Sequence, residues 1–228
     1  NRFIMKSLGD IRGKKIIELG CGLGEAAVYF AKKGAEVVAT DISSGMCELV
    51  KKVAKKHGVT LSTAQAYADK MPFPDESFDI VYAANLLHHV DIESALIEAR
   101  RVLKPGGRFV SWDPLAHNPA INVYRRMAMG VRTEDEHPIK MSQLALFRKH
   151  FREVKFETFW FTTLVIFLKF YFIDMINPNK ERYWKKILVD HKKLEKLYSV
   201  LERIDKIVLK FLPFLRRYCW NIAIIAEK

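Results

Sequence analysis

Cysteine is scarce in this sequence, and its spacing argues against its usual structural uses. The 228 residues contain three cysteines, Cys21, Cys47 and Cys219, an odd number without CxxC spacing. Disulfide frameworks need an even set, and zinc or redox sites need closely spaced pairs. A disulfide scaffold is therefore not indicated, no metal site is predicted, and a reducing, cytoplasmic compartment is expected.

Long apolar runs are also lacking. The longest, residues 161–173, contains Lys169 and falls short of the roughly 20 residues that span a bilayer. No signal peptide is present, but the sequence begins at Asn1 with only 14 residues before the first predicted strand, so we expect that an N-terminal piece is missing. Half of the residues are apolar, which is ample for the core of one large domain over residues 1–228.

Residues 15–41 predict a strand, a glycine-rich turn, a helix and a second strand. A short apolar run is followed by Gly20, Gly22 and Gly24, then by apolar residues at helical spacing, and the second strand ends at Asp41. Glycine lets backbone approach a ligand where a Cβ would clash, and the helix that follows presents free N–H groups and a positive dipole end. An acidic residue 21 positions after the first glycine is placed to accept hydrogen bonds from both ribose hydroxyls. The ligand is therefore expected to contain a nucleoside.

The spacing of the glycines distinguishes between nucleoside cofactors. Dinucleotide-binding loops read GxGxxG, whereas residues 18–24 read ELGCGLG, an ExGxGxG pattern. With this loop the sequence resembles the class I S-adenosylmethionine-dependent methyltransferases. A glycine-rich loop alone leaves a nicotinamide or flavin protein open, so the assignment depends on further motifs.

Two further segments resemble the same family. Residues 66–79, AYADKMPFPDESFD, correspond to a stretch that reads GDAEALPFPDGSFD in many members, and residues 98–109, EARRVLKPGGRF, contain the LKPGG that leads into the fifth strand. The resemblance covers residues 15 to about 112. It implies a type 11, quinone-biosynthesis-like enzyme that uses S-adenosyl-L-methionine. It also implies an α/β fold, with a Rossmann-like seven-stranded, mostly parallel sheet, helices on both faces and a helical insertion before the last strand.

The resemblance implies a set of cofactor contacts. Glu18 is expected near the amino acid moiety of the cofactor and Asp41 at its ribose. Tyr67 stands where the family usually has an acidic residue, so the contact to the adenine amino group passes to backbone or to Asp69. The expected contacts are Glu18, Gly20, Cys21, Gly22, Gly24, Asp41, Ile42, Met46, Tyr67, Ala68 and Asn85.

Four histidines are candidates for a catalytic base. Methyl transfer from a sulfonium is an in-line displacement, which needs a positioned nucleophile more than an elaborate acid–base apparatus. If the acceptor is a hydroxyl, its base is expected to be His88, His89, His117 or His137, because histidine titrates near neutral pH. His88 and His89 follow the fourth strand, but neighbours on a helix point about 100° apart, which argues against a shared metal. A packed or hydrogen-bonded structural role is the alternative for each.

The segment after residue 112 leaves the generic pattern and is expected to carry substrate specificity. It follows the fifth strand at its carboxyl end, the side where open α/β sheets bind ligands. The candidates for substrate contacts are Asp113, Asn118, Tyr124, Arg125 and Arg132. A solvated loop with paired charges is the alternative.

About sixty residues separate the predicted sixth and seventh strands, where the fold needs only a hairpin. Residues 161–173 are almost wholly apolar, and apolar side chains then recur three or four apart from residue 181 to Pro213, which predicts an amphipathic helix in two pieces. Residues 161–217 contain 13 Lys or Arg and 6 Asp or Glu, a surplus of seven out of the chain's formal +12. Such an insertion suits an anionic surface, either a membrane or nucleic acid. A helical lid or a dimer contact is the alternative.

The sequence therefore predicts methyl transfer to a small, lipophilic or membrane-associated acceptor, by an enzyme peripheral to the inner face of the membrane. RNA methylation is the rival. It is disfavoured because the turn after the fourth strand reads AANLLH instead of the [DN]PP[YFW] of enzymes that methylate exocyclic base nitrogens. An inactive cofactor-binding protein that docks on a membrane or partner is a third hypothesis. The acceptor atom and the oligomeric state are left open.

Overall fold

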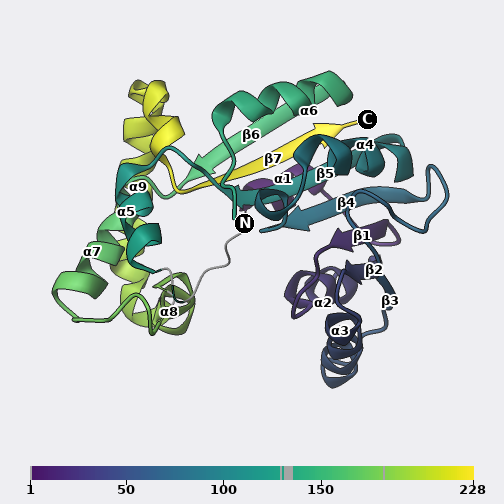
Figure 1. Ribbon diagram of the computed structural model, residues 1–228, viewed down its shortest axis with the longest axis horizontal. Coiled ribbons are helices and arrows are strands. Elements are labelled where there is room, and N and C mark those ends of the chain that lie inside the picture. The colour runs from purple at the N-terminus through teal and green to yellow at the C-terminus, as the bar shows by residue number, and fades with distance from the viewer. Residues whose placement is uncertain (1, 129, 131–135, 182) are drawn as a thin grey trace. The chain divides into compact units, whose positions relative to one another are not determined.

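The chain forms two compact units in a computed structural model (Figure 1), which describes residues 2–128, 130, 136–181 and 183–228. The first unit comprises the chain up to residue 113, residues 142–157 and residues 223–228. The second comprises residues 114–141 and 158–222. The chain therefore leaves the first unit twice and returns to it twice.

A seven-stranded sheet is the framework of the first unit (Figure 1). Its strands are β1 Lys15–Leu19, β2 Glu36–Asp41, β3 Ser62–Gln65, β4 Phe78–Ala84, β5 Leu103–Pro114, β6 Glu153–Phe159 and β7 Asn221–Glu227. They lie in the order β3-β2-β1-β4-β5-β7-β6. β1 pairs in parallel with β2 and β4, β2 with β3, and β4 with β5.

The last strand runs the other way. Lys228, just after β7, donates its N–H to Gly107 near the start of β5, and Arg152, just before β6, donates to Glu227 at the end of β7. The end of β7 thus meets the starts of both neighbours, so β7 is antiparallel to them, as the arrow directions of β6 and β7 in Figure 1 show. The predicted seven-stranded, mostly parallel sheet is confirmed.

Helices cover both faces of this sheet. They are α1 Arg2–Leu8, α2 Glu25–Lys32, α3 Ser44–Lys56, α4 Ile92–Val102 and α6 Leu144–His150, with 3₁₀ turns η1 Leu87–His89 and η3 Met141–Gln143. Ser43 begins α3 as predicted, because its side chain accepts a hydrogen bond from the Met46 N–H. On the opposite face α4 and α6 pack together, and Glu93 of α4 pairs with Lys149 of α6 at 2.6 Å.

The LKPGG segment differs from its prediction. The resemblance places LKPGG before the fifth strand, but β5 begins at Leu103, directly after α4, so LKPGG lies inside the strand. Phe78 of β4 is paired with Leu103, and Ile80 with Arg108, so the extra residues form a bulge inside the strand. Gly106 has φ +71°, a left-handed conformation that favours glycine, which explains why the bulge forms here.

The second unit is mainly helical. Its elements are α5 Pro119–Met127, the 3₁₀ turn η4 Thr162–Leu164, α7 Val165–Phe172, α8 Tyr183–Val189, α9 His191–Phe211 and the 3₁₀ turn η5 Pro213–Tyr218. The predicted amphipathic helix in two pieces is thus α8 and α9, and α9 ends two residues before Pro213. Among the residues described, no helix combines the length and the apolar character that crossing a membrane requires.

An aromatic core holds the second unit together. Phe167 of α7 packs edge-to-face on Trp220 and on Tyr183, with ring centroids 4.7 and 5.3 Å apart. These three side chains are at most 9% exposed. The unit therefore has its own apolar centre, although the prediction of one methyltransferase domain over residues 1–228, with residues 161–217 as a helical insertion, stays a prediction.

Candidate active site

The glycine-rich loop joins β1 to α2, and its three glycines have different structural roles. All three have positive φ, +63° at Gly20, +48° at Gly22 and +74° at Gly24. A Cβ at Gly20 would lie 2.8 Å from Cδ1 of Leu86, and one at Gly24 would lie 2.7 Å from Cγ1 of Val50. A Cβ at Gly22 would meet no described atom within 4 Å. Gly20 and Gly24 therefore permit close packing inside the unit, and the open space that a ligand needs lies at Gly22.

Asp41 ties the second strand to this loop. Its Oδ2 accepts a hydrogen bond from the Gly22 N–H at 3.0 Å, and its Oδ1 accepts one from the Ser43 N–H at 2.9 Å. β1 and β2 are neighbouring parallel strands, so their carboxyl ends bring Asp41 and the loop together. Each carboxylate oxygen has a second lone pair, so Asp41 can hold the loop and accept further hydrogen bonds from a diol.

Glu18 is a buried carboxyl group next to the loop. It is 5% exposed, and its Oε2 has no hydrogen-bond partner among the described residues. Burial raises the pKa of Glu18 to about 8, and the nearby carboxylates of Asp41 and Glu25 act in the same direction. A buried acceptor without a partner is costly to maintain, which makes Glu18 a candidate for binding a cationic group.

Cys21 is the other titratable group of the loop. Burial and the neighbouring carboxylates raise the pKa of its thiol to about 12. The thiolate needed for nucleophilic attack is therefore absent at neutral pH, and Cys21 contributes backbone to the loop, with its N–H donated to Thr40.

Large apolar side chains are exposed after β2 and β3. Ile42 is 58% exposed, Met46 38% and Tyr67 60%. Because β2 and β3 pair in parallel, the segments that follow them begin at the same edge of the sheet. Ala68 is half-buried beside Tyr67, and Asp69 is exposed. These side chains provide apolar surface for a flat ring.

The set of groups around the loop fits S-adenosylmethionine. The open backbone at Gly22 suits the carboxylate of a sulfonium cofactor, and the two acceptor oxygens of Asp41 suit its ribose. The unpartnered oxygen of Glu18 suits its ammonium group, and the exposed Ile42 and Met46 suit its adenine. All of these residues belong to the first unit.

A buried histidine–aspartate pair lies at the carboxyl ends of β4 and β5. His88 Nδ1 is 2.9 Å from Asp113 Oδ1, and the side chains are 7% and 0% exposed. Because a carboxylate can only accept, Nδ1 carries the proton of this hydrogen bond, and in the neutral imidazole Nε2 is then an acceptor. Sequence reasoning placed Asp113 with the substrate residues. Its partner could not be found from the sequence, because the two residues are 25 positions apart.

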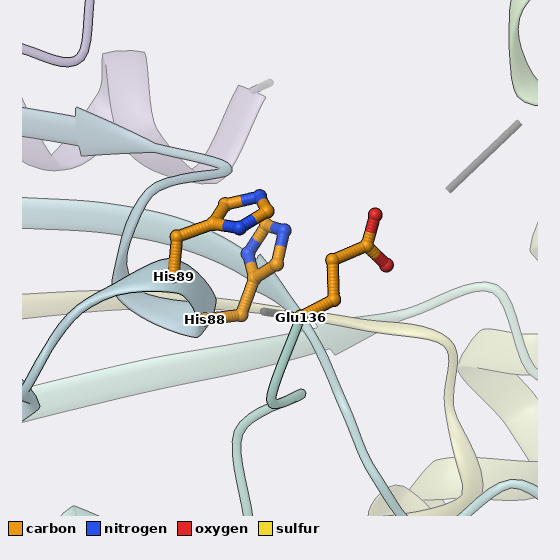
Figure 2. A group of neighbouring side chains, drawn as sticks. All are labelled: His88, His89 and Glu136. Atoms are coloured by element: carbon orange, nitrogen blue, oxygen red, sulfur yellow. The ribbon is translucent and has the colours of Figure 1, made fainter. Parts of the chain in front are cut away.

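The neighbouring imidazoles do not diverge as expected. Figure 2 shows the rings of His88 and His89 beside each other, and their centroids are 4.1 Å apart with a 41° tilt. Both come from the 3₁₀ turn η1, and Asp113 holds the ring of His88, so the rings pack together instead of pointing apart. Glu136, the third residue labelled in Figure 2, belongs to the second unit.

The other two candidate bases, His117 and His137, belong to the second unit. His117 is half-buried, and its Nε2 accepts the Met141 N–H at 3.4 Å. Burial lowers the pKa of His117, and the charges of Arg217 and Lys140 lower it further. His137 is exposed.

Three of the expected substrate residues form internal hydrogen bonds in the second unit. Asn118 begins α5 by accepting the Ile121 N–H at 3.0 Å. Arg125 is 9% exposed and donates to the Leu115 carbonyl at 3.0 Å. Tyr124 accepts the Tyr183 N–H at its hydroxyl, 3.3 Å away. Their contact with substrate stays a prediction, and Arg132 lies outside the described residues.

Arg101 is a structural residue that sequence reasoning missed. It forms an ion pair with Glu98 at 2.7 Å and donates to the carbonyls of Met71 and Phe73 at 3.2 and 2.9 Å. It therefore joins the second family motif to the third. The EARR run that precedes LKPGG was the available signal.

Comparison with known proteins agrees with this geometry. Residues 17–111 match the family described as methyltransferase domain. The chain is similar to the ubiquinone/menaquinone biosynthesis C-methyltransferase UbiE of Proteus mirabilis, with 33% identity over 115 residues, 48% of this chain and 46% of UbiE. It is also similar to the sterol 24-C-methyltransferase ERG6B of Gibberella zeae, with 38% identity over 111 residues, 47% of this chain and 29% of that protein. The chain thus spans about half or less of the length of these curated relatives.

The fold has counterparts among solved structures. One is phosphoethanolamine N-methyltransferase 2 of Haemonchus contortus in complex with S-adenosyl-L-methionine, with a TM-score of 0.66 and 19% identity over 99% of this chain and 51% of that chain. At this identity the likeness concerns the fold. The resemblance and the fold class predicted from the three motifs are confirmed.

Proposed function

Residues 17–111 belong to the S-adenosylmethionine-dependent methyltransferases, and from that premise we propose that this chain transfers the cofactor's methyl group to a small, lipophilic acceptor. The observation that carries the proposal is the arrangement around the β1–α2 loop. There an open glycine, an aspartate with spare lone pairs and a buried glutamate with a free oxygen lie in one unit.

Each of these groups has a role in cofactor binding. Asp41 accepts the two ribose hydroxyls while it holds the loop through Gly22. Glu18 accepts from the ammonium group, and this pairing offsets the cost of its burial. Ile42 and Met46 flank the adenine, with Tyr67 and Ala68 at its edge and Asn85 at the end of β4.

His88 is the group best arranged to take a proton from the acceptor. When bound, the cofactor supplies an electrophilic methyl group. Nε2 of His88 would take the proton of a hydroxyl acceptor that attacks this methyl group. Asp113 keeps the other ring nitrogen protonated and the ring in place.

The names of the relatives support a lipophilic acceptor. UbiE is named for ubiquinone and menaquinone synthesis, and ERG6B for methylation of a sterol. The proposal includes a peripheral position at the inner, cytoplasmic face of a membrane, reached through residues 161–217. An acceptor of this kind resides in the bilayer, and the same segment carries more than half of the chain's net positive charge.

Labelled methyl transfer into a cell extract tests the proposal. We expect label from S-adenosylmethionine to appear, by mass spectrometry, in the lipid-soluble fraction, and to be lost with Asp41→Ala. Label confined to RNA would replace this function with RNA methylation. Tight cofactor binding without label in any fraction would indicate an inactive protein that docks on a membrane or partner.

A further inference from the structure

Helix α9 carries an exposed apolar strip in addition to its buried apolar side. Leu194, Leu201, Asp205 and Leu209 are buried in the second unit, between 5% and 8% exposed. Four other residues, here called the outer stripe, are exposed by 40% to 74%: Val200, Ile204, Ile207 and Phe211. Successive residues of an α-helix lie about 100° apart around its axis. In that view the outer stripe covers an arc of roughly 60°, and the centre of this arc is about 130° from the centre of the buried residues. The sequence pattern merged these two faces into one.

Charge is arranged asymmetrically around the outer stripe. Five exposed basic residues fall within an arc of roughly 80° next to it, on the side away from the buried residues. This basic flank consists of Lys192, Lys196, Arg203, Lys206 and Lys210. The acidic residues Glu195 and Glu202 lie farther round, between the basic flank and the buried face. Basic side chains thus border the apolar stripe, and acidic ones are kept away from it.

We infer that the outer stripe and the basic flank of α9 form an interfacial surface that lies along an anionic lipid bilayer. This inference rests on the membrane contact proposed above and narrows it to one face of one helix. A helix that lies in the interface buries its apolar stripe at the boundary of headgroups and acyl chains, while lysines beside the stripe extend to the anionic headgroups. The outer stripe runs from Val200 to Phe211, so its apolar contact is about 17 Å long, and the basic flank extends the surface back to Lys192.

Charge complementarity selects the bilayer over a second copy of the chain. In a two-fold dimer that packs antiparallel α9 helices through the outer stripe, the same patch meets itself, and two basic flanks would lie side by side. Anionic headgroups neutralise that flank instead, with about 1 kcal/mol per basic residue near the surface. Phe214, in η5 just past the helix end, is also exposed, by 65%.

Vesicle co-sedimentation of the full chain tests the apolar part of this surface. We expect Ile204→Ser/Ile207→Ser/Phe211→Ser to weaken binding to phosphatidylcholine vesicles that contain phosphatidylglycerol by more than a hundredfold. The matched control, Ile97→Ser/Val123→Ser, removes apolar side chains that are 51% and 55% exposed elsewhere and should bind like the unmodified chain. Equal binding by the stripe variant and the control would overturn the inference.

A second pair of variants, one on α9 and one control on α3, tests the charged part of this surface. Lys196→Gln/Arg203→Gln/Lys210→Gln should weaken binding roughly a hundredfold at low salt and much less at high salt. Lys52→Gln/Lys55→Gln/Lys56→Gln, on the exposed side of α3, removes the same charge and should leave binding within about threefold of the unmodified chain. A similar loss in both variants would show a general charge effect and overturn the role of α9.

An environment-sensitive dye reports the orientation of the helix. The three native cysteines are buried and stay unlabelled, so the dye attaches only to an introduced cysteine. At Ile207→Cys, on the outer stripe, the emission of the dye should shift to the blue when vesicles are added. At Glu195→Cys, away from the stripe, it should not shift. Shifts at both positions, or at neither, would contradict the proposed face. Loss of a solution dimer in the stripe variant, measured by light scattering without vesicles, would assign the stripe to self-association instead.

S-adenosylhomocysteine affinity, measured by calorimetry on every variant, separates this inference from the proposed function. Unchanged affinity with lost vesicle binding supports the α9 surface. Absence of cofactor binding in the unmodified chain would refute the methyltransferase function, and the vesicle-binding result would remain valid. If the unmodified chain ignores anionic vesicles and binds structured RNA with a steep salt dependence, the membrane surface is refuted.

Discussion

The buried carboxylates of the two compact units are satisfied to different extents. In the first unit, Glu18 and Asp113 each have a carboxylate oxygen without a described partner, and both lie at the carboxyl ends of sheet strands. In the second unit, Asp205 accepts three hydrogen bonds, from the N–H groups of Phe161 and Thr162 and from the Thr162 hydroxyl. Incomplete satisfaction of buried polar groups is costly and is typical of binding sites, whereas complete satisfaction indicates a structural role.

The two units also differ in where their exposed apolar side chains lie. In the first unit, Ile42, Met46 and Tyr67 are exposed apolar side chains among the expected cofactor residues. In the second unit exposed apolar side chains follow the outside of helices, such as Phe172 of α7 and Phe211 of α9. The first unit therefore presents a site for a small molecule, and the second presents a surface.

The largest expected effect tests the structural role of Asp205. Asp205→Ala should lower the free energy of unfolding by about 3–5 kcal/mol, because the Phe161 and Thr162 N–H groups lose their acceptor. Chemical denaturation measures this loss, and Asp205→Asn, which keeps an acceptor oxygen, serves as the control with a smaller loss. Affinity for S-adenosylhomocysteine under folding conditions should be unchanged. A weaker affinity would break the distinction between the two units.

The next effect concerns turnover. His88→Gln should slow methyl transfer to a hydroxyl acceptor about 10²-fold, because Nε2 no longer takes up the proton. Steady-state kinetics with labelled cofactor measures the change, and cofactor affinity should be retained. His89→Gln, His117→Gln and His137→Gln are the comparison set. Wild-type rates in all four variants would leave positioning alone as the source of catalysis.

Asp41→Ala should weaken cofactor binding by at least tenfold. The change removes charge-assisted hydrogen bonds to the ribose, each worth about 1.5–3 kcal/mol, and also the acceptor that holds the Gly22 N–H. Calorimetry with S-adenosylhomocysteine measures the affinity. Asp41→Asn keeps one acceptor oxygen and should lose less. Unchanged affinity in a folded Asp41→Ala protein would remove this residue from the site.

The last effect is a pH dependence from Glu18, which is spread over several pH units. Its pKa is about 8 in the folded chain and near 4.5 when unfolded, so the folded state binds the extra proton between these values. The free energy of unfolding should therefore fall as pH rises from about 4.5 to 8, by up to about 1.4 kcal/mol per pH unit from this group. Glu18→Gln should remove this slope in denaturation measured across the range. An identical slope in both proteins would show that Glu18 ionises normally.

Local sequence determined the first unit to a large extent. The Gly20–Gly24 loop, the Ser43 cap of α3 and the end of β2 at Asp41 depend on neighbours within a few residues, because backbone conformation and capping are local properties. Parallel strand order then brings the carboxyl ends of β1 and β2 together, so the expected cofactor residues follow from short motifs. Periodicity also predicted α8 and α9, and the break near Pro213.

Only the tertiary structure decided which partners these residues meet. The pairing of His88 with Asp113 joins two strand ends across 25 positions, and the bond between Asp205 and Thr162 joins segments 43 positions apart, separations that no local pattern encodes. The two faces of α9 were likewise invisible in the sequence, because Leu201 and Ile204 are equally apolar and periodicity does not say which of them meets the core. The packing of α9 in the second unit removes Leu201 from water and leaves Ile204 exposed.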